Sequence, residues 1–204
     1  PTEKVPRLRR PRDLPPANPP WTDHELAVVL KAAPMELAVA VALGAYTGLR
    51  EGDVIALPLT AIDGGVIEWR QAKTGDPVYI PVHRDLAPYI RAARTLKQRK
   101  ATTVVIGQRG LPFTAAGFRA RCFKLIRDLR ASGKLARPLT FHGLRHTVAT
   151  RLADAGADDT TIQAILGHAT TAMSQKYRRQ ADRKRRTKAA VQLLERRPEK
   201  NKKR

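Results

Sequence analysis

The sharpest local pattern in the sequence is the H-G-L-R-H pentapeptide at positions 142–146. Residues three and four positions apart lie on one face of a helix, so His142, Arg145 and His146 project together. Thr140 is placed to cap that helix, and the free amides at a helix start favour an anion nearby. The planar guanidinium of arginine matches phosphate oxygens. The pentapeptide therefore favours an anion site that contains two imidazoles.

Two histidines at positions i and i+4 also suit zinc, and this alternative has to be weighed. No glutamate follows the first histidine here, and Arg145 places a cation between the two rings. A lone histidine on a helix is usually a structural residue, but two histidines and an arginine on one face favour a functional site. We expect a phosphate to bind here, without a metal ion or a small-molecule cofactor.

Three further constellations contain residues that can do chemistry. Arg50 follows a helix-ending glycine in T-G-L-R, and Asp53 is placed three residues later to pair with it. Lys73 lies in A-K-T-G at a predicted hairpin tip, where its ammonium group can reach a ligand or donate a proton. His168 follows L-G at a helix end. Tyr177 comes nine residues later, beside Lys176, Arg178 and Arg179.

Each of these residues also has an ordinary structural interpretation when it is taken alone. Arg50 and Asp53 could be a surface pair, Lys73 a solvated turn residue, and Tyr177 an exposed aromatic residue on a basic helix. The functional interpretation of Tyr177 is that neighbouring cations favour its phenolate, which would suit attack on phosphorus. The order of the whole set along the chain distinguishes between these interpretations.

Charge is the dominant compositional signal. The 204 residues include 39 Lys and Arg against 18 Asp and Glu, which gives a net charge of +21. Such a field attracts polyanions, and nucleic acid is the first candidate. An anionic membrane is the weaker alternative, because no basic amphipathic helix carries bulky apolar anchors and no apolar run approaches the ~20 residues of a membrane helix.

The single cysteine, Cys122, excludes an intramolecular disulfide and a cysteine-based metal site. It falls on the apolar stripe of a predicted helix, so we expect it to pack in the core rather than react. One cysteine and no recognisable signal peptide indicate a reducing, cytoplasmic location.

Periodicity and turn signals predict a mainly α fold with a small three-stranded antiparallel sheet (α+β). A capping box at Thr22 starts the first helix, and Gly48 ends the second. The other helices are predicted at about 51–56, 85–97, 114–131, 142–155, 160–166, 170–178 and 182–196. The strands are predicted at 60–63, 66–70 and 78–80, with a Gly-Gly hairpin turn between the first two.

The chain divides into three predicted regions. Residues 1–20 hold seven of the 15 prolines and five basic residues, which predicts an extended basic linker. Residues 21–197 form the predicted catalytic domain, and 198–204 a basic disordered tail. The linker resembles the far half of a connection to an upstream domain.

The ordered set of motifs resembles the tyrosine recombinase (phage integrase) family. An arginine in T-G-L-R, a hairpin lysine, H-x-L-R-H, L-G-H and a tyrosine nine residues later follow one another over positions 21–195. The resemblance maps the family's active-site residues onto Arg50, Lys73, His142, Arg145, His168 and Tyr177. Asp53 and His146 take supporting positions. The family's usual upstream core-binding domain has no counterpart in this sequence.

The resemblance implies a transesterification at a DNA phosphodiester. Tyr177 would attack the phosphorus, leaving a 3′-phosphotyrosyl enzyme, while the two arginines hold the non-bridging oxygens. Lys73 would protonate the leaving 5′-oxygen, His142 would act as general base near the tyrosine, and His168 would donate a hydrogen bond to a phosphate oxygen. Neither a metal nor a nucleotide cofactor is needed for these steps.

The expected partner is double-stranded DNA, bound in the cytoplasm during recombination or integration of a mobile element. Side chains predicted to contact its backbone phosphates are Arg119, Arg121, Lys124, Lys176, Arg178 and Arg179. The resemblance also implies a homotetramer on DNA that exchanges a C-terminal segment. We expect residues 189–197 to be that segment, anchored by Val191, Leu193 and Leu194.

Three other classes of function remain open at this point. A type IB topoisomerase would share the fold and the tyrosine chemistry, but would relax supercoils as a monomer. A catalytically silent DNA-binding module would have no need of Tyr177 and Lys73. A basic RNA-binding protein would not need the ordered phosphate-site residues, and competition between RNA and DNA would identify it.

Overall fold

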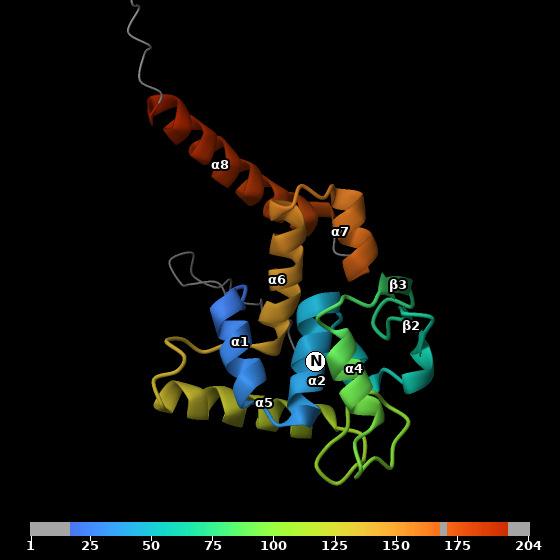
Figure 1. Ribbon diagram of the computed structural model, residues 1–204. Coiled ribbons are helices and arrows are strands. Elements are labelled where there is room, and N and C mark those ends of the chain that lie inside the picture. Colours follow the sequence, from blue (N-terminus) through green and yellow to red (C-terminus); the bar gives the residue numbers. More distant parts are fainter. Residues whose placement is uncertain (1–16, 168–170, 196–204) are drawn as a thin grey trace, which may run out of the picture.

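The computed structural model describes residues 17–167 and 171–195. Helices dominate the fold, and one small sheet is packed to the side of them (Figure 1). The elements, in chain order, are α1 (Asp23–Ala32), α2 (Met35–Thr47), α3 (Glu51–Ala56), a 3-10 turn η1 (Leu59–Ala61), β1 (Ile62–Asp63), β2 (Val66–Arg70), β3 (Pro77–Pro81), α4 (Ala87–Arg94), α5 (Ala115–Ala131), α6 (Phe141–Asp154), α7 (Asp159–Leu166) and α8 (Thr171–Glu195). The predicted fold class is confirmed.

Side-chain caps fix where four of the helices begin. Thr22 and Glu25 form the predicted capping box at the start of α1. The hydroxyls of Thr114 and Thr140 accept from backbone amides at the starts of α5 and α6. Asp158 caps α7 in the same way. Each cap satisfies an amide that the helix itself leaves unpaired, so these boundaries follow from local chemistry.

The sheet is a three-stranded antiparallel meander in the order β1-β2-β3. Gly64 and Gly65, both at positive φ, turn the chain between β1 and β2, as the sequence predicts. β2 pairs with β3 through the register Ile67 to Ile80, and both of these side chains face the core. The first strand is shorter than predicted, because residues 59–61 form the 3-10 turn after Pro58.

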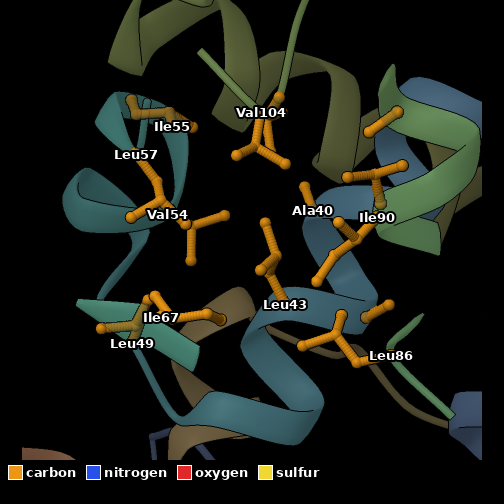
Figure 2. Close-up of a cluster of buried hydrophobic side chains, with 14 of the residues drawn as sticks. Ala40, Leu43, Leu49, Val54, Ile55, Leu57, Ile67, Leu86, Ile90 and Val104 are labelled. Atoms are coloured by element: carbon orange, nitrogen blue, oxygen red, sulfur yellow. The ribbon is translucent and has the colours of Figure 1, made fainter. Parts of the chain in front are cut away.

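The largest hydrophobic cluster surrounds the apolar helix α2 (Figure 2). Ala40 and Leu43 lie at its centre and are completely buried. Side chains from α3, β2, α4 and the segment that precedes α5 pack around them, including Val54, Ile67 and Val104. Helix α2 is buried on nearly all sides, which is why its sequence is apolar without a polar stripe.

Two smaller clusters complete the core, and α6 joins them. One cluster packs Trp21 of the chain before α1 against α1, α5 and Leu144 of α6. The other packs Val148 and Ala149 of α6 against α7 and α8. Helix α6 therefore lies between the body of the domain and the α7–α8 region, as Figure 1 shows.

The structure corrects two helix predictions. Helix α4 is shorter than the predicted 85–97, because it starts at Ala87, beside Pro88, and ends at Arg94. The two predicted helices at 170–178 and 182–196 are one helix, α8, which runs to Glu195. No glycine or proline occurs between its ends, so nothing in the sequence interrupts it. It extends away from the body (Figure 1).

Cys122 packs against the largest cluster, and desolvation raises the pKa of its thiol to about 12. The prediction that it is a core residue is confirmed. Among the described helices, none is both long enough and apolar enough to cross a membrane. Of the predicted linker, residues 1–16 lie outside the described part, as does the predicted tail at 198–204.

Candidate functional site

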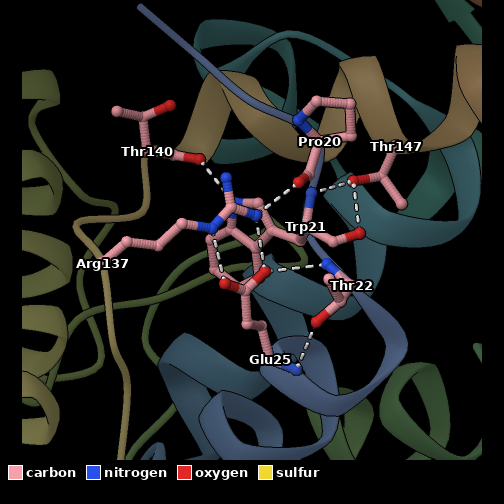
Figure 3. Close-up of polar contacts among 7 residues, drawn as sticks. All are labelled: Pro20, Trp21, Thr22, Glu25, Arg137, Thr140 and Thr147. Atoms are coloured by element: carbon pink, nitrogen blue, oxygen red, sulfur yellow. Dashed lines mark hydrogen bonds and ion pairs between the residues drawn. The ribbon is translucent and has the colours of Figure 1, made fainter. Parts of the chain in front are cut away.

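The chain before α1 crosses the start of α6 and fixes it in place (Figure 3). The backbone amide of Trp21 donates to Thr147 Oγ1 at 2.7 Å, and its indole Nε1 donates to the Thr140 carbonyl at 2.9 Å. Thr140 Oγ1 donates to Asn18 Oδ1 at 2.8 Å. We call residues 18–22 the strap. It tethers the helix that carries the H-G-L-R-H motif at two points.

A half-buried ion pair secures the strap from the other side. Arg137 donates to both carboxylate oxygens of Glu25 at 2.7 Å, and it also donates to the Pro20 carbonyl (Figure 3). Desolvation raises the pKa of the Glu25 carboxyl, but the hydrogen bonds from Arg137 and Thr22 together outweigh it, so the pKa lies below its ordinary value. A bidentate ion pair of this kind constrains the relative orientation of the two side chains as well as their distance.

Gly48 lets α2 end where α6 and α7 converge. It takes a left-handed conformation, with φ of 68°, and a Cβ at this position would lie 2.5 Å from the Leu166 side chain. Both the backbone angle and the close approach require glycine. The chain then turns so that Arg50, which directly precedes α3, points toward the end of α7.

Arg145 is the buried cation of the site, only 8% exposed. Its Nη1 donates to the Gly48 carbonyl at 2.8 Å and its Nη2 to the Gly167 carbonyl at 3.3 Å. Desolvation and, to a smaller extent, the charge of Arg50 together lower the pKa of Arg145 to about 10. It remains a cation at neutral pH.

The two predicted phosphate-binding arginines converge on one oxygen atom. Arg50 Nη2 donates to the Gly167 carbonyl at 3.4 Å, and Arg145 donates to the same carbonyl. They come from positions far apart in the sequence and are brought together by the ends of α2 and α7. Two guanidiniums that share one acceptor repel each other, and anionic or strongly polar oxygens between them stabilise the pair.

Tyr177 of α8 lies against α6, and its partner there is His146. The Tyr177 hydroxyl is within hydrogen-bonding contact of His146 Nδ1. The His142 ring packs edge-on against His146, with 4.9 Å between the centroids. The prediction that His142 is the histidine next to the tyrosine is therefore wrong in this arrangement. His146 lies one helical turn closer to α8 because α8 packs beyond the first turn of α6.

The electrostatics of this pair differ from the prediction. Desolvation raises the pKa of Tyr177, although the charge of Arg145 acts in the opposite direction. The predicted stabilisation of the phenolate by neighbouring cations is overturned, because burial outweighs it. Desolvation also lowers the pKa of His146 to about 4, with the charges of His142 and Lys176 adding to the effect. At neutral pH the neutral imidazole can accept the tyrosine proton.

Asp53 holds the β2–β3 hairpin, and the predicted pairing with Arg50 is wrong. Its Oδ1 accepts from Trp69 Nε1 at 3.1 Å and from the Ala72 amide at 2.9 Å. Ala72 directly precedes Lys73, which is exposed at the hairpin tip as predicted. Desolvation has the largest effect in lowering the pKa of His142. The charge of Lys73 makes a smaller contribution in the same direction, so the tip lies within electrostatic reach of the site.

The remaining predicted site residues fall into three groups. His168 lies outside the described residues. Three predicted DNA contacts are engaged in ion pairs: Arg119 with Glu51, Lys124 with Asp128, and Arg178 with Asp159. For the other three, the structure gives surface positions on α5 and α8: Arg121, Lys176 and Arg179. Across the described ranges, no three His, Cys, Asp or Glu side chains gather as metal ligands would.

Gln71, just after β2, is a site residue that the sequence analysis missed. It is completely buried, accepts a hydrogen bond from Arg50 Nη1, and donates to the Leu166 carbonyl at 2.9 Å. A signal was present: Gln71 continues the alternation of inward-facing positions that includes Ile67 and Trp69. An amide on the core face of a strand needs polar partners, and here they belong to the site.

The fold and the two convergent arginines beside a tyrosine–histidine pair define a catalytic domain of the tyrosine recombinase type. The sequence model described as "Phage integrase family" matches residues 23–184, so the chain belongs to that family. The tyrosine recombinase XerD of Bradyrhizobium diazoefficiens is 32% identical over 181 residues, covering 83% of this chain and 54% of that protein. The chain spans about half the length of the first curated relatives that it matches.

Solved structures give the same result. The crystal structure of XerA recombinase superposes with a TM-score of 0.70 at 26% identity, covering 86% of this chain and 66% of the other. A lambda integrase tetramer bound to a Holliday junction gives a TM-score of 0.66 at 26% identity, covering 83% of this chain and 50% of that chain. The fold is therefore that of recombinase catalytic domains.

Proposed function

We propose that this domain cuts and rejoins double-stranded DNA as a site-specific recombinase, using Tyr177 as the nucleophile. The observation that carries the proposal is the convergence of Arg50 and Arg145 on one carbonyl oxygen beside the half-buried pair of Tyr177 and His146. Two guanidiniums that already share an oxygen acceptor have the placement needed to hold two non-bridging oxygens of a phosphodiester.

In the proposed reaction the Tyr177 oxygen forms a bond to the scissile phosphorus while the bond from phosphorus to the 5′-oxygen breaks. The tyrosine proton passes to Nδ1 of the neutral His146, and Lys73 supplies the proton that the departing 5′-oxygen takes up. The products are a 3′-phosphotyrosyl enzyme and a free 5′-hydroxyl. His142, packed on His146, would orient that ring, and His168 keeps its proposed role as a donor to phosphate.

The same proposal assigns the basic surface to the DNA backbone. Helix α8 carries cations along most of its length, and the side chains at 183–192 are all exposed. Contacts of this kind position a protein on DNA without reading its sequence. We place Arg119, Arg121, Lys124, Lys176, Arg178 and Arg179 in this role, with the ion-paired cations exchanging carboxylates for phosphates on binding.

A homotetramer on DNA is the proposed working assembly, as in the lambda integrase structure. Helix α8 reaches past Ala189 away from the body (Figure 1), and the apolar side chain of Val191 is 46% exposed. Both features suit a segment that packs on a neighbouring copy. The other two proposed anchors, Leu193 and Leu194, have side chains outside the described part, as have residues 196 and 197.

The exchange proposal has a direct test. A chain that ends before Ala189 keeps every described site residue, so it should still bind DNA but should fail to assemble beyond a monomer or dimer. Light scattering on DNA-bound complexes measures this. Unchanged assembly by the truncated chain would remove the exchanged segment from the proposal.

Covalent trapping tests the proposed reaction without knowledge of the target site. A pool of nicked duplexes with randomised centres is incubated with the protein and a chelator, and SDS-resistant adducts are recovered and sequenced. The nick releases the cleaved 5′-end, so the adduct accumulates. An adduct that disappears in Tyr177→Phe would support both the nucleophile and the reaction class. An adduct that persists in Tyr177→Phe would place the nucleophile elsewhere, and relaxation of supercoiled DNA by the monomer would indicate the topoisomerase alternative.

A further inference from the structure

Gln71 links the end of β2 to Arg50 and to the end of α7. Its Oε1 accepts from Arg50 Nη1, and its Nε2 donates to the Leu166 carbonyl at 2.9 Å. The carboxamide oxygen thus accepts from the guanidinium, and the carboxamide nitrogen donates to the last backbone carbonyl of α7. Gln71 is completely buried, so water does not offer these groups an alternative partner.

The contact extends to Gly167, the acceptor that both arginines share. A Cβ on Gly167 would lie 2.3 Å from Gln71 Nε2, so the backbone there packs directly against the amide. The Gly167 carbonyl accepts from Arg50 and from Arg145. Gln71 therefore contacts one arginine directly, and it contacts the backbone whose oxygen fixes the second.

We propose that Gln71 is a positioning residue for strand cleavage. It fixes the position of Arg50 relative to the Leu166–Gly167 backbone, so that the guanidiniums of Arg50 and Arg145 can bind the same phosphate. The proposal rests on the proposed function, since it assigns Gln71 to the arginines of that reaction. It also goes further, because it makes the end of β2 part of the machinery that aligns the site.

If Gln71 only filled space in the core, its side chain would not need polar atoms. An apolar side chain of similar length would fill the space, whereas a buried amide is tolerated only when its polar atoms are paired. Here one of those pairs is a hydrogen bond to a cation of the site, and bonds to charged groups are stronger than neutral ones. Gln71→Met preserves the volume and removes both bonds, so it separates packing from positioning.

The first experiment compares variants on the duplex that the wild-type chain traps most efficiently. Gln71→Met is expected to slow adduct formation about 10- to 100-fold, the range for losing a hydrogen bond to a charged group. Gln71→Glu keeps an oxygen toward Arg50 but turns the second oxygen against the Leu166 carbonyl, so an intermediate rate is expected. Val78→Ala opens a cavity in the same hairpin without touching Arg50, and it should match the wild-type rate once folded fractions are equal.

A neutral substrate distinguishes positioning from general damage. A methylphosphonate at the scissile position removes one negative charge that an arginine must hold. On it, the defect of Gln71→Met should shrink about tenfold, as should that of Arg50→Ala, because a misplaced arginine matters less. An equal defect of Gln71→Met on both substrates would overturn the proposal. An adduct that persists in Tyr177→Phe would instead contradict the proposed nucleophile.

A second experiment needs no DNA. The Nη protons of Arg50, identified by their absence in Arg50→Lys, should exchange slowly with water in the wild-type chain. Gln71→Met should accelerate that exchange and shift the backbone amide of Gly167, while Val78→Ala should leave both unchanged. Arg50 signals that are the same in Gln71→Met and the wild type would refute the positioning role, whether or not the domain cleaves DNA.

Discussion

Helices α6 and α8 carry opposite sides of the proposed reaction, and the domain supports them differently. Helix α6 holds His142, Arg145 and His146, and it is enclosed by α2, the strap and the α7–α8 region. Helix α8 holds Tyr177, yet among its described side chains only Ser174 and Ala181 are buried. The groups that would balance charge are fixed in advance, while the nucleophile is carried on a helix with few buried contacts.

This difference suits the proposed chemistry. Electrostatic stabilisation is effective when donors are already aimed before the charge develops, which requires a rigid frame. A nucleophile has to approach and then leave its phosphorus, which suits an element with a small buried area. The following predictions test whether the two helices differ as much as their burial indicates.

The largest effect is expected at the strap. Trp21→Ala removes a buried indole and the hydrogen bond that its Nε1 donates to the Thr140 carbonyl, and should lower the free energy of unfolding by about 3–5 kcal/mol. Chemical denaturation measures this. Phe123, an aromatic residue on α5 that is 69% exposed, provides the matched control, and Phe123→Ala should stay within about 0.5 kcal/mol of wild type. Similar losses in both variants would show that the strap does not hold α6.

Arg145 should give the next largest effect, in catalysis. Arg145→Met leaves the phosphate without its buried cation and should slow adduct formation about 100- to 1,000-fold, equivalent to about 3–4 kcal/mol of barrier. Arg130→Met, on the exposed last turn of α5, should leave the rate unchanged. A loss below about threefold for Arg145→Met would mean that α6 does not supply the charge balance.

One substitution made in both helices compares them directly. Ala149→Gly in α6 loses a buried methyl group and helix propensity, so the free energy of unfolding should fall by about 2 kcal/mol. Ala190→Gly in α8 has the same propensity penalty, but it lies in the exposed stretch and should change global unfolding by less than about 0.5 kcal/mol. Equal losses would mean that the far part of α8 unfolds together with the body.

A pH titration tests His146, which lies at the contact of the two helices. Folding lowers its pKa to about 4 from an ordinary value of 6.5, so the folded state favours the neutral ring. Its contribution to stability is complete above pH 6.5 and is lost as the pH falls toward 4. Stability should therefore decline less steeply over this window in His146→Gln than in the wild type. Parallel curves would indicate that the ring is not desolvated.

The smallest effect on folding is expected from the exposed cations of α8. Arg183→Ala combined with Arg186→Ala should leave stability within about 0.5 kcal/mol of wild type. The slope of log affinity for duplex DNA against log salt should decrease by about 2, close to 0.9 for each lost phosphate contact. Lys31→Ala on α1 is the control. An unchanged slope in the double variant would remove this stretch of α8 from the DNA-binding surface.

Local chemistry allowed most of the fold to be predicted. The Thr22 capping box, the Thr140 cap and Gly48 all act within a few residues of their own position, so their roles can be read from short patterns. The Gly64-Gly65 hairpin belongs to the same class. The continuity of α8 was missed because a charged sequence without an apolar stripe gives little periodic signal, although the absence of glycine and proline argued for one helix.

The site was less predictable, because its details depend on distant partners. Arg50 and Arg145 were found from their motifs, but Asp53 was paired with its near neighbour in the sequence instead of with Trp69 and Ala72. His142 and His146 share a helix face, and only the packing of α8 shows which of them meets Tyr177. The raised pKa of Tyr177 likewise depends on burial by three helices, which composition around the tyrosine does not reveal.

The continuity of α8 also sets an angular relation along its axis. Fourteen residues separate Tyr177 from Val191, and at about 100° and 1.5 Å per residue they lie about 21 Å apart along the axis and only about 40° apart around it. The Tyr177 side chain and the exposed valine thus share one side of a single rod. Twisting the far end of the rod would turn the tyrosine by the same angle. One inserted residue would rotate one side chain by about 100° relative to the other and leave the two about 60° apart on the opposite side.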